Sequence, residues 1–143
     1  FFCDDDILLP ANHLSILYNR LKGRTDIGYV YSDYWGIVLD QGNHPKKNNY
    51  YHKALPFDEN ALKKGNYIST MSLIRRSVFP GFDPAIKRFQ DWDLWLSLLE
   101  KGVVGEYVES TGFMAFYIDC GITSEKIPAM EARKVLQTKH NIC

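Results

Sequence analysis

The chain has 143 residues, of which 45% are hydrophobic and 14% aromatic, enough to bury one core and to predict a single domain over residues 1–143. Seventeen basic and seventeen acidic residues cancel, and this balance argues against a nucleic-acid-binding protein. No apolar run approaches the roughly 18 residues that span a bilayer, so we expect no transmembrane segment. Three cysteines without paired spacing favour reduced thiols and a cytoplasmic location.

The chain begins with an aromatic pair and a cysteine, followed by three consecutive carboxylates, Asp4, Asp5 and Asp6, and by the apolar residues 7–9. This pattern is typical of a buried strand that ends at an acidic site, where α/β folds bind their ligands. Because adjacent like charges repel one another, we expect a cation such as Mg²⁺ or Mn²⁺ among them. The alternative is a solvated acidic turn that caps the following helix.

Beyond residue 9, apolar residues at helical spacing alternate with runs rich in β-branched and aromatic residues. In chain order we predict a helix over residues 12–22, strands over 26–34 and 36–40, a polar loop over 41–49, a helix over 56–64, a strand over 68–74, a turn over 81–84, a helix over 91–101, strands over 103–108 and 112–118, and a helix over 129–139. In the turn over residues 81–84, Asp83 can cap a helix and Pro84 can begin it. Alternating strands and helices predict the α/β class.

Asp91 and Asp93 lie at the start of the clearest predicted helix, where the macrodipole favours a carboxylate. The dipole also lowers the pKa of such an Asp, which keeps it ionised but makes it a weak base. A weak base suffices when the proton comes from a hydroxyl that is already attacking an electrophile. On residue types alone, we interpret both residues as helix-start acids.

The first ten residues resemble the acidic metal-binding segment of family 2 glycosyltransferases, F-L-D-x-D-D-x-x-x-P. Further short motifs follow in that family's order, at residues 29–33, 66–68, 73–76, 81–83 and 90–96. The likeness extends from Phe1 to about Ser124 and corresponds to the second half of the GT-A domain. It implies a partial GT-A fold with a mixed sheet flanked by helices. It also implies that the chain is a fragment that lacks the N-terminal nucleotide-binding βαβ half.

The resemblance implies a metal-dependent, inverting transfer of a sugar from a nucleotide-diphosphate donor to an acceptor hydroxyl. Asp5 would be the main ligand of Mn²⁺ or Mg²⁺, Asp4 would lie near the metal and the donor ribose, and Asp6 would be an auxiliary donor-binding acid. Asp91 would be the general base that takes the proton of the acceptor hydroxyl. Many members have Asp at the place of Cys3, so the choice between Asp4 and Asp5 as first ligand stays open.

Four further residues enter through the resemblance. The family often has Tyr-Arg-x-His near the end of the domain, and Asp119 stands here in the place of the metal-binding His, so that the ligand role is either kept by a carboxylate or lost. Asn66 and Ser69 fall where the family's acceptor-side strand enters the cleft. Trp92 lies near the base and could stack on the acceptor, although a core position is the favoured interpretation.

The remaining polar residues receive structural interpretations. His13, His44, His52 and His140 share no ligand spacing and are expected on the surface or in loops. The pair at residues 75–76 could reach a diphosphate, but a solvated pair is the commoner case.

The expected partners are a nucleotide-sugar donor and a saccharide or lipid-linked acceptor, as in the synthesis of cell-envelope polysaccharides. The inner face of the membrane is the candidate place of action, and an exposed sheet edge favours self-association. A non-catalytic cation-binding or assembly module derived from such an enzyme is the alternative. A metal-dependent phosphohydrolase is a weaker one.

Overall fold

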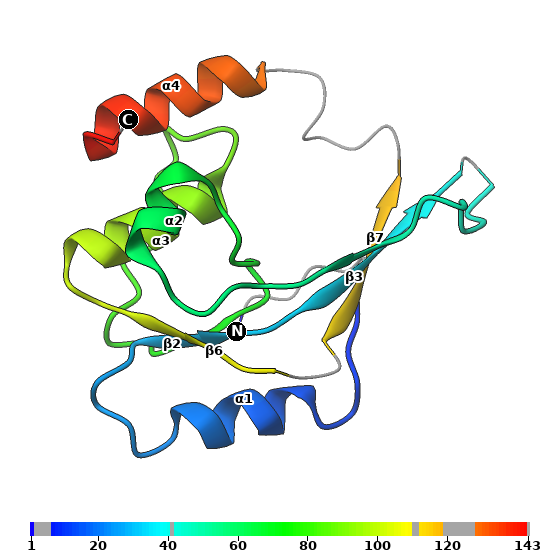
Figure 1. Ribbon diagram of the computed structural model, residues 1–143, viewed down its shortest axis with the longest axis horizontal. Coiled ribbons are helices and arrows are strands. Elements are labelled where there is room, and N and C mark those ends of the chain that lie inside the picture. Colours follow the sequence, from blue (N-terminus) through cyan, green and yellow to red (C-terminus); the bar gives the residue numbers. More distant parts are fainter. Residues whose placement is uncertain (2–6, 41, 110–111, 119–127, 143) are drawn as a thin grey trace.

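The computed structural model describes residues 1, 7–40, 42–109, 112–118 and 128–142, which form two mixed sheets and four helices (Figure 1). The predicted α/β class is therefore confirmed, although the described residues build two sheets where one was expected. No helix in the described part of the chain is long and apolar enough to cross a membrane.

Seven short strands form the two sheets. They are β1 (Ile7–Leu8), β2 (Tyr29–Tyr31), β3 (Tyr34–Leu39), β4 (Tyr50–His52), β5 (Leu73–Ile74), β6 (Gly105–Tyr107) and β7 (Phe113–Ile118). The larger sheet has the order β1-β7-β3-β4, in which β3 and β7 are parallel and the outer strands antiparallel to them. The smaller sheet has the order β5-β2-β6, with β2 and β6 parallel and β5 antiparallel to β2.

All four predicted helices are present, close to their predicted bounds. They are α1 (His13–Leu21), α2 (Glu59–Lys64), α3 (Gln90–Glu100) and α4 (Ala129–His140). The start of α2 is capped by Asp58, whose side chain accepts a hydrogen bond from the Ala61 amide at 2.9 Å, and Gly65 follows its last residue.

The core lies on both faces of the smaller sheet, because successive residues of β2 point to opposite sides. Tyr29 and Tyr31 face α3, where the ring of Tyr29 stacks on Trp95 with centroids 4.8 Å apart. Val30 faces the other way and packs against Leu17 of α1. The smaller sheet is therefore a buried middle layer between α1 and α3, which is visible in Figure 1 as the level of β2 and β6.

Three predicted elements differ from the structure, and each contains or adjoins a polar side chain that bonds to a backbone amide. The strand expected over residues 26–34 breaks after Tyr31, because β2 and β3 belong to different sheets, and the buried Asp33 between them accepts a hydrogen bond from the Ala54 amide. Ser69 and Asn66 accept bonds from nearby backbone amides, which shortens the strand expected over 68–74 to β5. Asp83 accepts from the Ala85 amide in a turn that does not continue as a helix.

Arg75 is a structural residue and not a solvated one. Its guanidinium donates to the backbone oxygens of Ile27, Leu21 and Arg24. Leu21 is the last residue of α1, and its carbonyl, which also accepts from the Arg24 amide at 3.2 Å, is one of those at the carboxyl end of the helix that need a donor from outside it. The expectation of a solvated pair at residues 75–76 is therefore wrong for Arg75.

His13 is also buried, with only 1% of its surface exposed, against the expectation of a surface position. Its ring contacts those of Phe1 and Phe113 edge to face, with centroids 6.3 and 5.8 Å apart. Burial lowers the pKa of His13, because a desolvated imidazolium is costly. A neutral histidine thus packs as an aromatic core residue at the start of α1. His44 is exposed in its loop, as expected.

Candidate active site

The candidate general base, Asp91, lies in the first turn of α3 and is partly buried. Its Oδ2 accepts a hydrogen bond of 2.7 Å from the Asn66 side-chain amide. Its Oδ1 accepts from the Trp92 backbone amide at 2.9 Å. Asn66 is fixed in turn, because its own Oδ1 accepts from the Ile68 amide at 3.0 Å. Two predicted site residues, Asp91 and Asn66, are therefore in direct contact.

The pKa of Asp91 is raised above its ordinary value, with burial as the largest cause. Hydrogen bonds from two backbone amides and from Asn66 act in the opposite direction and do not cancel the effect. The expectation that the helix dipole makes this residue a weak base of low pKa is therefore wrong. Desolvation outweighs the helix start and makes Asp91 a stronger proton acceptor.

The residue before α3 has a backbone conformation that residues other than glycine rarely adopt. Phe89 has φ 63° and ψ 36°, in the left-handed region. Its carbonyl accepts from the Asp93 amide at 3.0 Å, which begins the helix, and its ring contacts Trp92 edge to face. Such strain costs of order 1 kcal/mol and is concentrated at functional sites. It lies two residues before the candidate base.

The other two predicted substrate residues have structural partners. Trp92 is 3% exposed, and its indole N–H donates to the Leu62 carbonyl at 2.8 Å, so the core interpretation describes its position. Ser69 bonds within its own turn, where its hydroxyl accepts from the Met71 amide and its carbonyl accepts from the Ser72 hydroxyl. Neither contact directs a polar group toward Asp91.

Tyr34, at the start of β3, interacts electrostatically with Asp91. The sequence analysis did not predict this residue for the site. The pKa of Tyr34 is raised to about 12, mainly by burial, with Tyr50 and Asp91 adding to the shift. Its ring stacks on Phe113 and on His52, with centroids 5.2 and 4.7 Å away. Residues at every second position of β3 share a face, and this alternation could have grouped Tyr34 with the rest of the strand. The predicted strands ended at residue 34 and began again at residue 36, so Tyr34 was assigned to the preceding strand.

A second buried carboxylate, Asp33, is held by three donors and has a structural role. It is 1% exposed, and its Oδ1 accepts from the Ala54 amide at 2.7 Å. Its Oδ2 accepts from the hydroxyls of Tyr51 and Tyr107, each at 2.7 Å. Asp33 thereby ties β4 and β6, which belong to different sheets, to the segment between β2 and β3.

The implied metal ligands Asp4, Asp5, Asp6 and Asp119 lie outside the described residues. Within the part that the structure describes, no group of three His, Cys, Asp or Glu side chains could hold a metal ion. Among the described strands that flank these residues, β1 and β7 are antiparallel neighbours. Ile7, the first residue of β1, pairs with Ala115, so β1 begins beside the middle of β7 and not beside its end.

Asp93 points away from Asp91 into a charged cluster between α3 and α4. Its Oδ1 accepts from His140 Nε2 at 2.8 Å and from Lys139 Nζ at 2.7 Å. The other ring nitrogen of His140 contacts Glu100 at 2.7 Å, and the imidazole side chain is 2% exposed. The expected surface position of His140 is therefore wrong, and Asp93 joins two helices.

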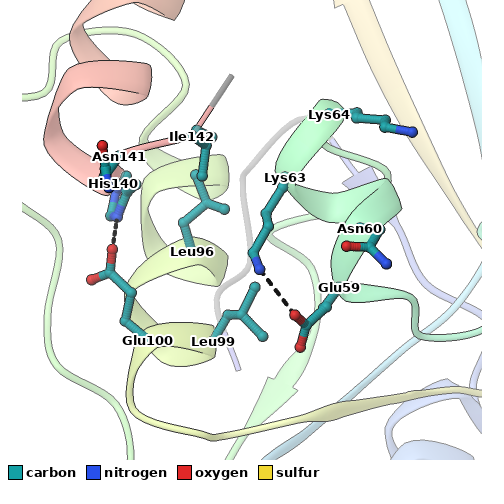
Figure 2. A pocket seen from close by; sticks show the side chains of 10 residues that line it. All are labelled: Glu59, Asn60, Lys63, Lys64, Leu96, Leu99, Glu100, His140, Asn141 and Ile142. Atoms are coloured by element: carbon teal, nitrogen blue, oxygen red, sulfur yellow. Dashed lines mark hydrogen bonds and ion pairs between the residues drawn. The ribbon is translucent and has the colours of Figure 1, made fainter.

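A groove of about 650 Å³ lies between α2, the carboxyl half of α3 and the end of α4. Figure 2 shows the side chains that line it. Leu96 and Leu99 line it together with charged side chains, among them the Glu59–Lys63 and Glu100–His140 pairs. The groove contains no residue that the sequence predicts for the site. We place the candidate site at Asp91, because a desolvated carboxylate is there beside a polar, aromatic sheet face.

Comparison with known proteins adds no family to this picture, because no family model, no curated protein and no solved structure matches the chain. The resemblance to family 2 glycosyltransferases therefore stays a prediction that rests on the sequence motifs.

Proposed function

We propose that this chain carries the metal- and acceptor-binding part of a metal-dependent, inverting glycosyltransferase. The observation that carries the proposal is Asp91, a desolvated carboxylate of raised pKa that Asn66 holds in one orientation. A general base needs both a fixed direction and a pKa closer to the working pH than that of an ordinary Asp.

In the proposed reaction, Asp91 accepts the proton of an acceptor hydroxyl while the oxygen attacks the anomeric carbon of the donor sugar. The new carbon–oxygen bond forms as the bond to the diphosphate breaks, and the diphosphate leaves with that electron pair. Asn66 donates to Asp91 Oδ2, which leaves a further lone pair of this carboxylate for the hydroxyl. A single displacement of this kind requires one base and no enzyme nucleophile.

The metal part of the proposal rests on the sequence motif. Asp5, Asp4 and Asp119 would hold Mn²⁺ or Mg²⁺, with Asp6 as an auxiliary acid, and the ion would neutralise the departing diphosphate. The described strands β1 and β7 that flank these residues are neighbours in the larger sheet. The acceptor would be a saccharide, free or lipid-linked, and the reaction would take place in the cytoplasm.

The test compares two neighbouring carboxylates in the polypeptide encoded by the complete reading frame. Asp91→Asn should reduce metal-dependent sugar transfer at least about a hundredfold, the scale of a lost general base, and should leave thermal stability intact or raised. Asp93→Asn should lower thermal stability and keep the turnover of the folded protein.

Radiolabelled nucleotide sugars with Mn²⁺ measure the transfer, and thermal melting measures the stability. Full transfer by Asp91→Asn would contradict the mechanism and favour a non-catalytic module.

A further inference from the structure

One face of the larger sheet carries three tyrosines, of which Tyr34 interacts electrostatically with Asp91. In the β3–β4 and β3–β7 ladders, Tyr34 pairs with His52 and Phe113, Gly36 with Tyr50 and Ala115, and Val38 with Tyr117. Residues at every second position share a face, so Tyr34, Tyr50 and Tyr117 lie on the same side of the sheet.

The floor of this face is shaped to hold an aromatic ring flat. Gly36 has no side chain, and a Cβ atom there would lie 2.2 Å from a ring carbon of Tyr50, so the Tyr50 ring covers the Gly36 backbone. Tyr117 lies next to it, with ring centroids 6.2 Å apart and an angle of 23° between the planes. Both tyrosines are 42% exposed, so a two-ring surface of nearly common orientation faces outward.

Of the three tyrosines, Tyr34 is the one that interacts electrostatically with the candidate base. The Tyr34 side chain interacts with those of Tyr50 and Tyr117. The charge of Asp91 contributes to the raised pKa of Tyr34. The ring of Tyr34 is fixed between Phe113 and His52. The arrangement is therefore preorganised, and a ligand would bind without first ordering it.

The chemistry of the surface selects its ligand. Phenol rings offer apolar faces for the C–H groups of a pyranose and hydroxyls for its polar edge. The three side chains are neutral, and the nearby carboxylate of Asp91 repels a phosphate. We propose that Tyr50 and Tyr117 form a platform that binds the pyranose ring of an uncharged saccharide, with Tyr34, whose ring contacts that of Tyr50 edge to face, at its border. That this saccharide is the acceptor rests on the proposed function; its binding does not.

The experiment is an NMR titration of the ¹⁵N-labelled 143-residue chain with cellohexaose and maltohexaose, and separately with uridine diphosphate, without metal or donor. The saccharides should shift the amide signals of Tyr50 and Tyr117. Tyr50→Leu and Tyr117→Leu should each weaken binding by about three- to tenfold, the range expected for one aromatic contact. Tyr50→Phe keeps the ring and should bind within about twofold of the parent chain.

Trp35→Leu is the matched control, since Trp35 is also 42% exposed on β3 but belongs to the opposite face. Its saccharide affinity should be unchanged. Three results would each overturn the platform: no saccharide shift, loss of binding in Trp35→Leu with retention in Tyr50→Leu, or shifts at Tyr50 and Tyr117 with uridine diphosphate alone.

Two outcomes separate the platform from the proposed function. Binding without any sugar transfer by the complete polypeptide would refute the proposed function and keep the platform. Transfer in a protein whose Tyr50 and Tyr117 variants bind and react normally would refute the platform and keep the function.

Discussion

At the scale of single residues, burial decides the chemistry of the candidate base more than its place on the helix does. A carboxylate in the first turn of α3 has amide donors and the helix dipole in its favour, and these lower the pKa. Burial by the surrounding residues desolvates the carboxylate of Asp91 and raises its pKa, and this is the larger effect. The sequence shows the helix start, but it does not show how deeply one side chain of that turn will be buried.

A raised pKa in the folded state makes Asp91 a destabilising group once it is ionised. The unfolded chain releases this proton near the ordinary value of 3.8, whereas the folded chain retains it to higher pH. Between the two pKa values the folded state binds more protons, so the free energy of unfolding falls as pH rises through that window. Asp91→Asn removes this loss. Its stability relative to the parent chain should therefore increase from pH about 4 upward and level off above the raised pKa.

Urea unfolding of both chains between pH about 3 and about 8 measures the difference, in which the titration of all other groups cancels. A difference that is constant over this range would show that the pKa of Asp91 is not raised. Asp83→Asn is a suitable control, because hydrogen bonding to Lys139 lowers the pKa of that carboxyl. Its stability difference from the parent chain should have the opposite dependence on pH.

At the scale of elements, helices were predictable and the contacts between them were not. The stripe that includes Trp92, Trp95 and Leu96 identifies α3, because helical periodicity is a local property of the sequence. The contact of Asp93 with His140 joins residues 47 positions apart, and no local sequence pattern predicts it. Strand β4 has only three residues, too few for a periodic signal, and was not predicted.

The same limit applies to the candidate site. Asp91 and Asn66 were found through motif order, and the structure brings them into contact. Tyr50 and Tyr117 belong to the site only through strand register, which fixes the residues that share a face. Sequence patterns identified the residues with distinctive chemistry, while the aromatic surface beside them required the sheet.

The charged cluster between α3 and α4 should contribute strongly to stability. The side chains of His140 and Asp93 are 2% and 4% exposed, so Asp93→Asn removes a buried carboxylate that bonds both His140 and Lys139. Asp93→Asn should lower the free energy of unfolding by about 3 kcal/mol, near the lower end of the range for a broken buried pair. Lys139 is 32% exposed and thus reaches solvent, so Lys139→Ala should cost less, about 1 kcal/mol.

Urea unfolding measures both variants, and the order of the two losses is the decisive result. If both variants lost the same free energy of unfolding, the cluster would behave as a surface network. Burial of the His140 imidazole would then have no influence on the stability that the cluster contributes. A larger loss for Lys139→Ala would place the main connection between the helices at the exposed end of the cluster.

At the scale of the whole molecule, burial is unevenly distributed between the two sheets. The three residues of β2 are fully buried between two helical layers, and α3 has five buried apolar side chains, Trp92, Leu94, Trp95, Leu96 and Leu98. The end of β3 at Val38 and Leu39 is only half-buried, and β4 exposes Tyr50 and Tyr51. In Figure 1 this part of the larger sheet projects away from the helices. The proposed saccharide platform therefore belongs to the less protected part of the fold.

Native-state hydrogen exchange should separate the amides of the buried core from those of the exposed end of the larger sheet by their protection. The amides of Trp95 and Leu96 should exchange only through global unfolding, because opening α3 exposes the main core. The Val38 amide, which donates to the Asn49 side chain at 3.0 Å, should exchange through a local opening of lower free energy. Asp93→Asn provides the control, since it lowers global stability without contacting β3. It should reduce protection at Trp95 and Leu96 by its full effect on unfolding and leave Val38 unchanged. Equal reductions at all three amides would show that the larger sheet unfolds only together with the core.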